Sequence, residues 1–198
     1  MELFFIIVMS LTSVIGLAFI VERGIALRWN RVVPAAIERA AQACRAADDR
    51  AALRRLCEQS TAPLARLLLV AEEHLDLTPE ENESALQTRA RHEIVGLERG
   101  LVVLEIVVGI APLLGLVGTI YGMMTLFGSM SDAGLADNTH LAQGISLILR
   151  FTMAGLLIAI PSLIAWNYYT KKVEMLAVEM ETICADFLRR QYQARLKK

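Results

Sequence analysis

Three long apolar stretches alternate with charged segments along the chain. They run from Leu3 to Val21, from Leu101 to Phe127 and from Ile145 to Tyr169. At about 1.5 Å of rise per residue, each stretch is long enough as a helix to cross the ~30 Å hydrocarbon core of a bilayer. The pattern therefore predicts an all-α integral membrane protein with three transmembrane helices and long helical extensions beyond the membrane.

Basic residues mark one side of this predicted membrane. Arg23 follows the first apolar stretch and Lys171 follows the third, whereas the segment between the second and third stretches has no Lys or Arg. Because loops rich in Lys and Arg stay in the cytoplasm, the N-terminus is expected outside and the C-terminus inside. The expected segments are transmembrane helix 1 (1–22), a cytoplasmic helical insert (23–100), transmembrane helix 2 (101–127), an outer loop (128–144), transmembrane helix 3 (145–169) and a cytoplasmic C-terminal helix (170–198).

The first apolar stretch has a second interpretation, as a cleaved signal peptide. Signal peptides carry basic residues before the apolar run and small residues at the cleavage site. Here the acidic Glu2 precedes the run and Val21-Glu22-Arg23 ends it. An uncleaved membrane span is therefore favoured.

The charged insert is predicted to be mostly helical. One helix begins at Pro34, a short second helix covers 50–59 and a third begins near Pro63. Thr78-Pro79-Glu80-Glu81 is a strong helix start, with a capping threonine, a proline at the first helical position and a glutamate three residues after the cap. We expect one continuous helix from there into the second span.

The third span is expected to continue as a helix beyond the membrane. An apolar stripe at helical spacing follows Lys171 and predicts packing on another helix; its members are Val173, Leu176, Met180, Ile183 and Phe187. The basic tail from Arg189 is expected to be solvated or to touch lipid, and His92-Glu93 is expected on a solvated face.

Composition narrows the possible functions. The chain has 198 residues with 20 Lys and Arg against 21 Asp and Glu, and a net charge of -1 gives no electrostatic basis for binding nucleic acid. Mean hydropathy is +0.47, as expected of membrane helices. The three cysteines, Cys44, Cys57 and Cys184, have no zinc-site spacing and are expected as free thiols. No catalytic set, phosphate loop or metal motif occurs, so we expect neither an enzyme nor a cofactor.

Polar side chains inside the predicted membrane are candidates for function because they are costly there. Glu105 and Thr119 are close to four turns apart and share one face of the second helix. Thr152 shares a face of the third helix with Gly155 and Ala159, while Arg150 points away from it and is expected to reach head groups or to pair at a subunit contact.

Glycines recur on adjacent turns of the second span. Gly115, Gly118 and Gly122 have the spacing that lets helices approach closely. Packing is the simpler interpretation of these residues. The faces that mix small, apolar and hydroxyl side chains could also line a narrow path.

Two motifs together resemble one family. The stretch APLLGLVGTIYGMMTLF (Ala111–Phe127), followed by GISLILRFTMAGLLIAIPSLIAWNYY (Gly144–Tyr169), resembles the MotA/TolQ/ExbB proton channel family and is most similar to its ExbB/TolQ branch. The resemblance covers about residues 95–170, and the rest of the chain agrees with it in topology.

The resemblance implies a homopentamer around a central pore in the bacterial cytoplasmic (inner) membrane, with the outer segments in the periplasm. It implies ExbD/TolR-like single-span partners with a membrane aspartate, and a TonB-like or other periplasmic effector driven by the proton motive force. The family's two functional threonines correspond to Thr119 and Thr152. The expected pore-lining set is Thr119, Thr152, Glu105, Gly115, Gly122, Gly155 and Ala159, with Arg150 at the outer entrance or an interface.

One position departs from the family pattern. Family members commonly have glutamate near the start of the third span, where this chain has Leu147, and Arg150 is also unusual there. Two hypotheses follow: a conducting subunit, or a membrane scaffold of the same fold that has lost conduction. The ion, H⁺ or Na⁺, is left open by the sequence.

Overall fold

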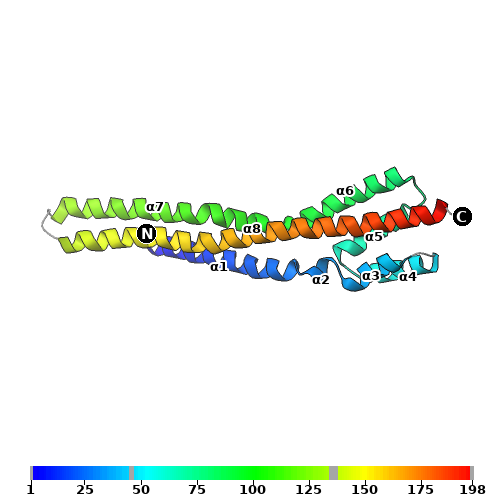
Figure 1. The fold of residues 1–198 in the computed structure, drawn as a ribbon. Coiled ribbons are helices and arrows are strands. Elements are labelled where there is room, and N and C mark those ends of the chain that lie inside the picture. Colours follow the sequence, from blue (N-terminus) through cyan, green and yellow to red (C-terminus); the bar gives the residue numbers. More distant parts are fainter. Residues whose placement is uncertain (1, 45–46, 134–137, 197–198) are drawn as a thin grey trace. The chain divides into compact units, whose positions relative to one another are not determined.

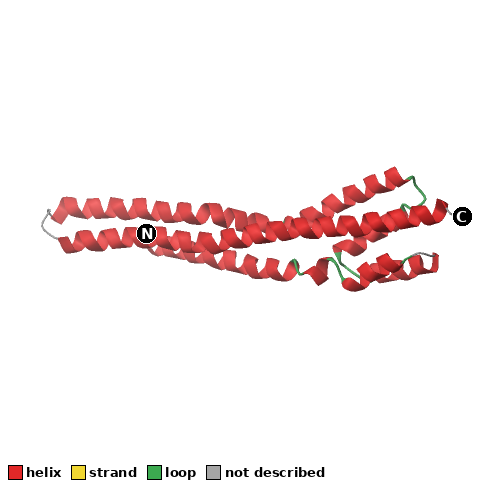
Figure 2. Ribbon diagram, viewed as in Figure 1, coloured by secondary structure: helices red, strands yellow, loops and turns green. Residues whose placement is uncertain are grey.

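A computed structural model describes residues 2–44, 47–133 and 138–196. These residues form eight helices and no strand (Figure 2). The helices are α1 (Glu2–Ala26), α2 (Trp29–Val32), α3 (Ala35–Ala43), α4 (Ala47–Glu58), α5 (Pro63–Glu73), α6 (Pro79–Glu98), α7 (Leu101–Ala133) and α8 (Asn138–Leu196) (Figure 1). The all-helical prediction is confirmed.

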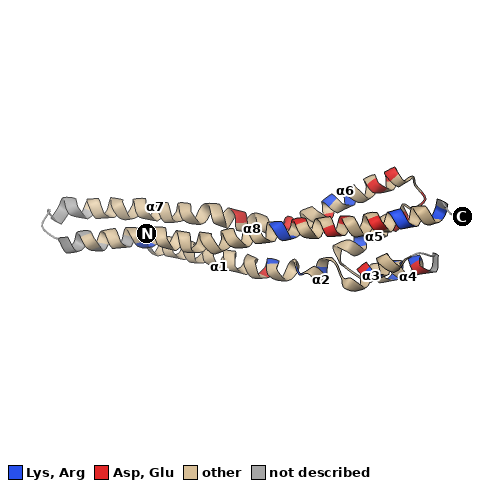
Figure 3. Cartoon of the chain, viewed as in Figure 1, with Lys and Arg blue, Asp and Glu red and all other residues tan. Residues whose placement is uncertain are grey.

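The chain divides into two compact units. The first, here called the apolar unit, comprises Met1–Arg23 and Gly100–Tyr168. The second, the polar unit, comprises Gly24–Arg99 and Tyr169–Lys198. Charged side chains gather on the helices of the polar unit, whereas the α7 and α8 segments of the apolar unit are almost free of them (Figure 3).

Three helices are long and apolar enough to cross a membrane, as the sequence predicts. They cover Leu3–Ala26, Leu101–Gly128 and Gly144–Arg195, the last of which continues well past the length that a bilayer needs. In the apolar unit α7 and α8 lie side by side (Figure 1). They are antiparallel, because Gly118 faces Phe151 and Gly122 faces the earlier Ile148.

Helix α1 packs along this pair. Phe5 near its start contacts Tyr121 and Phe151, with ring centroids 5.5 and 6.2 Å apart. Eleven residues later, Gly16 lies against Val107 and Ser162. Helix α1 is therefore antiparallel to α7 and runs in the same direction as α8.

The polar unit has a packed apolar core. The predicted stripe on α8 is buried along its whole length, and α5 contributes most of its residues to the same interior. Helix α6 begins with the predicted capping box: Thr78 Oγ1 accepts a hydrogen bond from the Glu81 amide, and the Glu81 carboxylate accepts one from the Thr78 amide. Both predictions are confirmed, as are three free cysteines, all of them buried.

Two expectations about element boundaries differ from the structure. The helix that starts after Thr78 ends at Glu98, and α7 begins anew at Leu101. Gly100 lies at this break against the flexible side chain of Arg23, and glycine is a poor helix former. Most of the expected loop 128–144 is helical, with the connecting residues 134–137 outside the described part. The polar side chains in 128–144 indicate where the chain leaves the membrane, but they do not require the helix to end there, because a helix can continue into water.

The basic tail is also not a free solvated end. Arg190 donates a hydrogen bond to the carbonyl of Ala41, and Gln191 donates one to the carbonyl of Cys44. Arg195 bonds the carbonyl of Leu75 and the carboxylate of Asp76. Side chains at the end of α8 therefore satisfy carbonyl groups at helix ends and loops of the polar unit.

Candidate functional site

Thr119 lies on the buried side of α7. Its side chain is 8% exposed, and its hydroxyl donates a hydrogen bond of 2.6 Å to the carbonyl of Leu116 on the preceding turn. This bond satisfies the hydroxyl inside an apolar environment. Its oxygen keeps both lone pairs as hydrogen-bond acceptors.

Thr152 differs from Thr119 in both respects. Its side chain is exposed, and among the described residues its hydroxyl has no hydrogen-bond partner. Phe151 on α8 contacts Gly118 on α7. Thr152 is the next residue after Phe151, and Thr119 is the next residue after Gly118. The two threonines therefore lie within about one helical turn of the same level on the antiparallel pair.

Both threonines also lie on the same side of the pair, away from α1. On α7 the reference direction is Gly118, which faces α8. Around the helix axis, Thr119 lies about 100° to one side of Gly118, and Tyr121, which contacts α1, lies about 60° to the other side.

On α8 the reference direction is Gly155, which faces α7. Around this axis, Thr152 lies about 60° to one side of Gly155. Ala154, which packs against the α1 residues Phe5 and Met9, lies about 100° to the other side. The structure thus brings Thr119 and Thr152 together on an α1-free face.

The small residues of the predicted set lie in the contact between α7 and α8. A Cβ at Gly155 would be 2.7 Å from the carbonyl oxygen of Ala111, and one at Gly115 would be 2.9 Å from the carbonyl oxygen of Phe151. Gly122 lies against Ile148 in the same way, and Ala159 is buried. These residues allow the close crossing that positions the two threonines.

Glu105 and Arg150 lie apart from the threonines. Glu105 is exposed on the α1-free face, about 21 Å along α7 from Thr119 at the helical rise per residue. Arg150 is two residues before Thr152, so it lies on the opposite side of α8, where it borders a groove against α1. The structure therefore separates Arg150 from the pair of threonines.

Carboxylates are scarce around this face. Among the described side chains of the apolar unit the acids are Glu22, which is paired with Arg23, and Glu105. Neither lies at the level of the threonines. Because threonine does not titrate in the working range, a proton path at this level needs a carboxylate from elsewhere.

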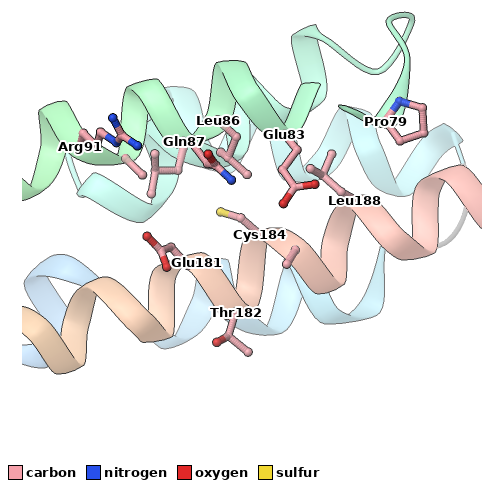
Figure 4. A pocket seen from close by; sticks show the side chains of 12 residues that line it. Pro79, Glu83, Leu86, Gln87, Arg91, Glu181, Thr182, Cys184 and Leu188 are labelled. Carbon is pink, nitrogen blue, oxygen red and sulfur yellow. The ribbon is translucent and has the colours of Figure 1, made fainter. Parts of the chain in front are cut away.

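A groove of about 470 Å³ lies within the polar unit between α6 and α8 (Figure 4). Apolar side chains line most of it, the charged residues Glu83, Arg91 and Glu181 lie along it, and the Cys184 thiol points into it.

The buried thiols of the polar unit have raised pKa values. Burial raises the pKa of Cys184 to about 12, and burial together with Glu72 and Glu58 raises the pKa of Cys57 to about 11. Thiols with such pKa values are poor nucleophiles at neutral pH. No group of three or more His, Cys, Asp and Glu side chains placed to hold a metal ion was found in the described part of the chain.

One buried charge was missed by the sequence analysis. Glu93 is 5% exposed rather than solvated, and its carboxylate binds the guanidinium groups of Arg66 and Arg89, each with a contact of 2.9 Å. The spacing of Arg89 and Glu93, four residues apart on a helix, was visible in the sequence. Arg66, on α5, could not be assigned to this cluster without the tertiary structure.

Comparison with known proteins agrees with this geometry. The profile of the MotA/TolQ/ExbB proton channel family matches residues 36–182. The chain is 32% identical over 164 residues to the biopolymer transport protein ExbB-like 3 of Synechocystis, an alignment that covers 79% of this chain and 76% of that protein. This chain belongs to the MotA/TolQ/ExbB proton channel family.

Shorter alignments link the chain to both named branches of the MotA/TolQ/ExbB family. It is 38% identical to the biopolymer transport protein ExbB of Helicobacter pylori, over 41% of this chain and 56% of that protein. It is 33% identical to the Tol-Pal system protein TolQ of Pseudomonas aeruginosa, over 52% of this chain and 45% of that protein. The chain is therefore a multi-pass membrane protein of a family of channel proteins rather than enzymes.

Proposed function

We propose that this chain is the ExbB/TolQ-like subunit of a proton channel in the bacterial inner membrane. In this proposal, proton flow energises an envelope process such as TonB-dependent transport across the outer membrane. The relatives support the class of process, since those described above are named as biopolymer transport and Tol-Pal system proteins. Five copies form a ring around a central pore, with the α1-free face of each copy toward the pore.

The observation that carries the proposal is the placement of the two threonines. Thr119 and Thr152 come from different helices to one level of one face, and Thr152 presents a hydroxyl that no described residue of the chain bonds. Five copies would place rings of hydroxyl groups around the pore at that level. Such groups orient or relay a proton but need a titrating partner.

The missing carboxylate defines the expected partner. An ExbD/TolR-like single-span protein inside the ring would bring a membrane aspartate to the level of Thr119 and Thr152. A TonB-like or other periplasmic effector would then receive the resulting motion. Basic residues at 23–31 and 171–172 support a cytoplasmic polar unit and a periplasmic N-terminus under the positive-inside rule.

Valine variants of the two threonines test the ion path. Thr152→Val and Thr119→Val keep the side-chain shape and remove the hydroxyl, so each should assemble with the partner but lose at least tenfold in proton flux into vesicles. Thr12→Val on α1 is the matched control, because its hydroxyl is also bonded to a backbone carbonyl inside a span but lies off this face. Full flux in both Thr119→Val and Thr152→Val would contradict the path.

A non-conducting scaffold is the second candidate, and Leu147 favours it. Family members commonly carry glutamate at this position near the outer end of the third span, and leucine cannot carry a proton. If the wild-type chain forms a stable complex with its partner and that complex passes no protons, the scaffold function is correct. The flux experiment therefore separates the two candidates.

A further inference from the structure

A groove runs between α1 and α8 on the side of the apolar unit opposite the threonines. It has a volume of about 640 Å³ and its walls are mainly apolar. Ile6, Met9 and Val14 line it from α1, and Leu157 and Ile158 line it from α8. Because this groove lies between two membrane spans, its natural contents are hydrocarbon rather than water.

Three polar side chains interrupt this apolar lining. They are Arg150 on α8 and Ser10 and Ser13 on α1. Within the described part of the chain none of the three has a hydrogen-bond or ion-pair partner, although Thr12 and Ser162 nearby bond the carbonyls of their own helices. Unsatisfied polar groups are costly in hydrocarbon, and a serine can bond a carbonyl of its own helix whereas an arginine cannot hide its charge in this way. Arg150 is therefore the group that most requires an acceptor from an occupant of this groove.

The position of Arg150 indicates the depth of that occupant. Arg150 precedes Phe151, which contacts Phe5 in the second turn of α1, and the first apolar span begins at Leu3. Arg150 also lies six residues, about 9 Å, past Gly144, where the apolar stretch of α8 begins. A long basic side chain can extend from this depth toward the phosphate groups of lipids. Arg150 is also the only Lys or Arg from residue 101 to residue 170.

The length of the groove fits an acyl chain. From Ile6 to Val14 it extends about 12 Å along α1 at the helical rise per residue. A smaller cavity of about 110 Å³ continues it past Ser13 along Leu17 and Ile20. Together they extend about 21 Å from Ile6 to Ile20, which is more than one leaflet, half of the ~30 Å hydrocarbon core.

We propose that the α1–α8 groove binds one anionic phospholipid, with its phosphate on Arg150 and one acyl chain along the apolar wall. Ser10, the serine nearer to Arg150, donates a hydrogen bond to an ester carbonyl, which lies between phosphate and chain. Ser13, about 4.5 Å further along α1, lies beside the acyl chain. The site is separate from the α1-free face, so it exists whether or not the chain conducts protons. Bound lipid would fix α1 against α8 at the outer end of the unit.

Lipid titration of the purified complex tests this site. The wild-type chain, with its partner in detergent, is titrated with dioleoyl phosphatidylglycerol and the bound lipid is counted by native mass spectrometry. Arg150→Gln should weaken binding at least tenfold, as expected for loss of a charge-assisted hydrogen bond. Arg150→Lys should restore most of it, and glycerol phosphate, which lacks acyl chains, should not bind at the same concentrations.

The controls separate this site from bulk charge and from subunit contacts. Lys171→Gln removes a cation at the other end of the third span and should leave the tight binding unchanged. Equal lipid binding by wild type and Arg150→Gln would overturn the proposal. So would an Arg150→Gln complex that separates into single subunits while each retains the lipid, because Arg150 would then serve a contact between copies.

Discussion

The two units cover their apolar side chains in opposite ways. In the polar unit, the apolar side chains are covered by other parts of the same chain: Leu176 and Phe187 on α8 are 0% exposed. In the three spans, only 17%, 33% and 24% of the most apolar stretch is buried. The polar unit therefore has a self-contained core, whereas the apolar unit depends on lipid and neighbouring subunits for most of its coverage.

The units also differ in how they satisfy polar groups. The polar unit pairs its buried charge inside the chain, as Glu93 with Arg66 and Arg89 shows. The apolar unit leaves Thr152 and Arg150 without described partners, on opposite sides of α8. The side chains without hydrogen-bond partners are thus at the two places where we propose that other molecules bind: the partner subunit near Thr152 and a lipid at Arg150.

The largest expected loss of stability comes from a variant that disrupts the close contact between α7 and α8 in the apolar unit. Gly155→Ala places a methyl group 2.7 Å from the backbone oxygen of Ala111, so α7 and α8 must move apart. We expect a loss of about 3 kcal/mol in the free energy of unfolding, the upper range for overpacking. Thermal unfolding of the detergent-purified chain, followed by circular dichroism, measures it.

Gly109→Ala is the matched control for that variant. Gly109 likewise lies inside a long membrane helix, α7, but a Cβ there meets nothing within 4 Å. Since alanine favours a helix over glycine by ~1 kcal/mol, this variant should be neutral or more stable. Equal melting temperatures for Gly155→Ala and Gly109→Ala would show that the close crossing does not matter to stability.

The second largest expected loss of stability comes from a variant that disrupts the ion pairs of Glu93 in the polar unit. Glu93→Gln leaves Arg66 and Arg89 without their counter-charge, which is costly for a buried group. Both arginines are 38% exposed, so solvent screens part of the effect and we expect about 2 kcal/mol. Hydrogen exchange of α5 and α6 in the full chain reports it, with Glu98→Gln on the exposed face of α6 as the control.

The same cluster predicts a dependence of stability on pH. Burial raises the pKa of Glu93, but the hydrogen bond and charge of Arg66, with the charges of Arg89 and His92, outweigh it and hold the pKa below its usual 4.5. A depressed pKa contributes stability above about pH 4.5 that is lost as the pH falls through the lower folded value. Protection of α6 should therefore drop on acidification in wild type, and Glu93→Gln should lack this component of the drop.

The smallest effect concerns the start of α6. Thr78→Ala removes the side chain that accepts a hydrogen bond from the Glu81 amide, which typically costs ~1 kcal/mol. Faster amide exchange confined to the first turn of α6 is the expected result. Thr88→Ala, which removes an exposed hydroxyl that bonds the carbonyl of Ser84 in the same helix, should show little change; similar exchange in both variants would argue against the cap.

Much of this protein follows from sequence alone. The three apolar stretches, the capping box at Thr78 and the stripe that continues α8 are local periodic patterns, and the structure confirms them. The family follows from two motifs in the second and third spans, and the profile match confirms it. These features depend on residues close together in the chain, so neighbouring side chains suffice to specify them.

Tertiary structure decided what depends on contacts between distant segments. Only the antiparallel register of α7 and α8 places Thr119 and Thr152 within about one turn of the same level. Only the packing of α1 leaves their side of the pair free of α1 and gives Arg150 its groove. Likewise, Gly100 meets the side chain of Arg23 from α1, and the buried Glu93 pairs with Arg66 from another helix. A helical pattern fixes which residues share a face, but the neighbour that the face meets is decided by packing.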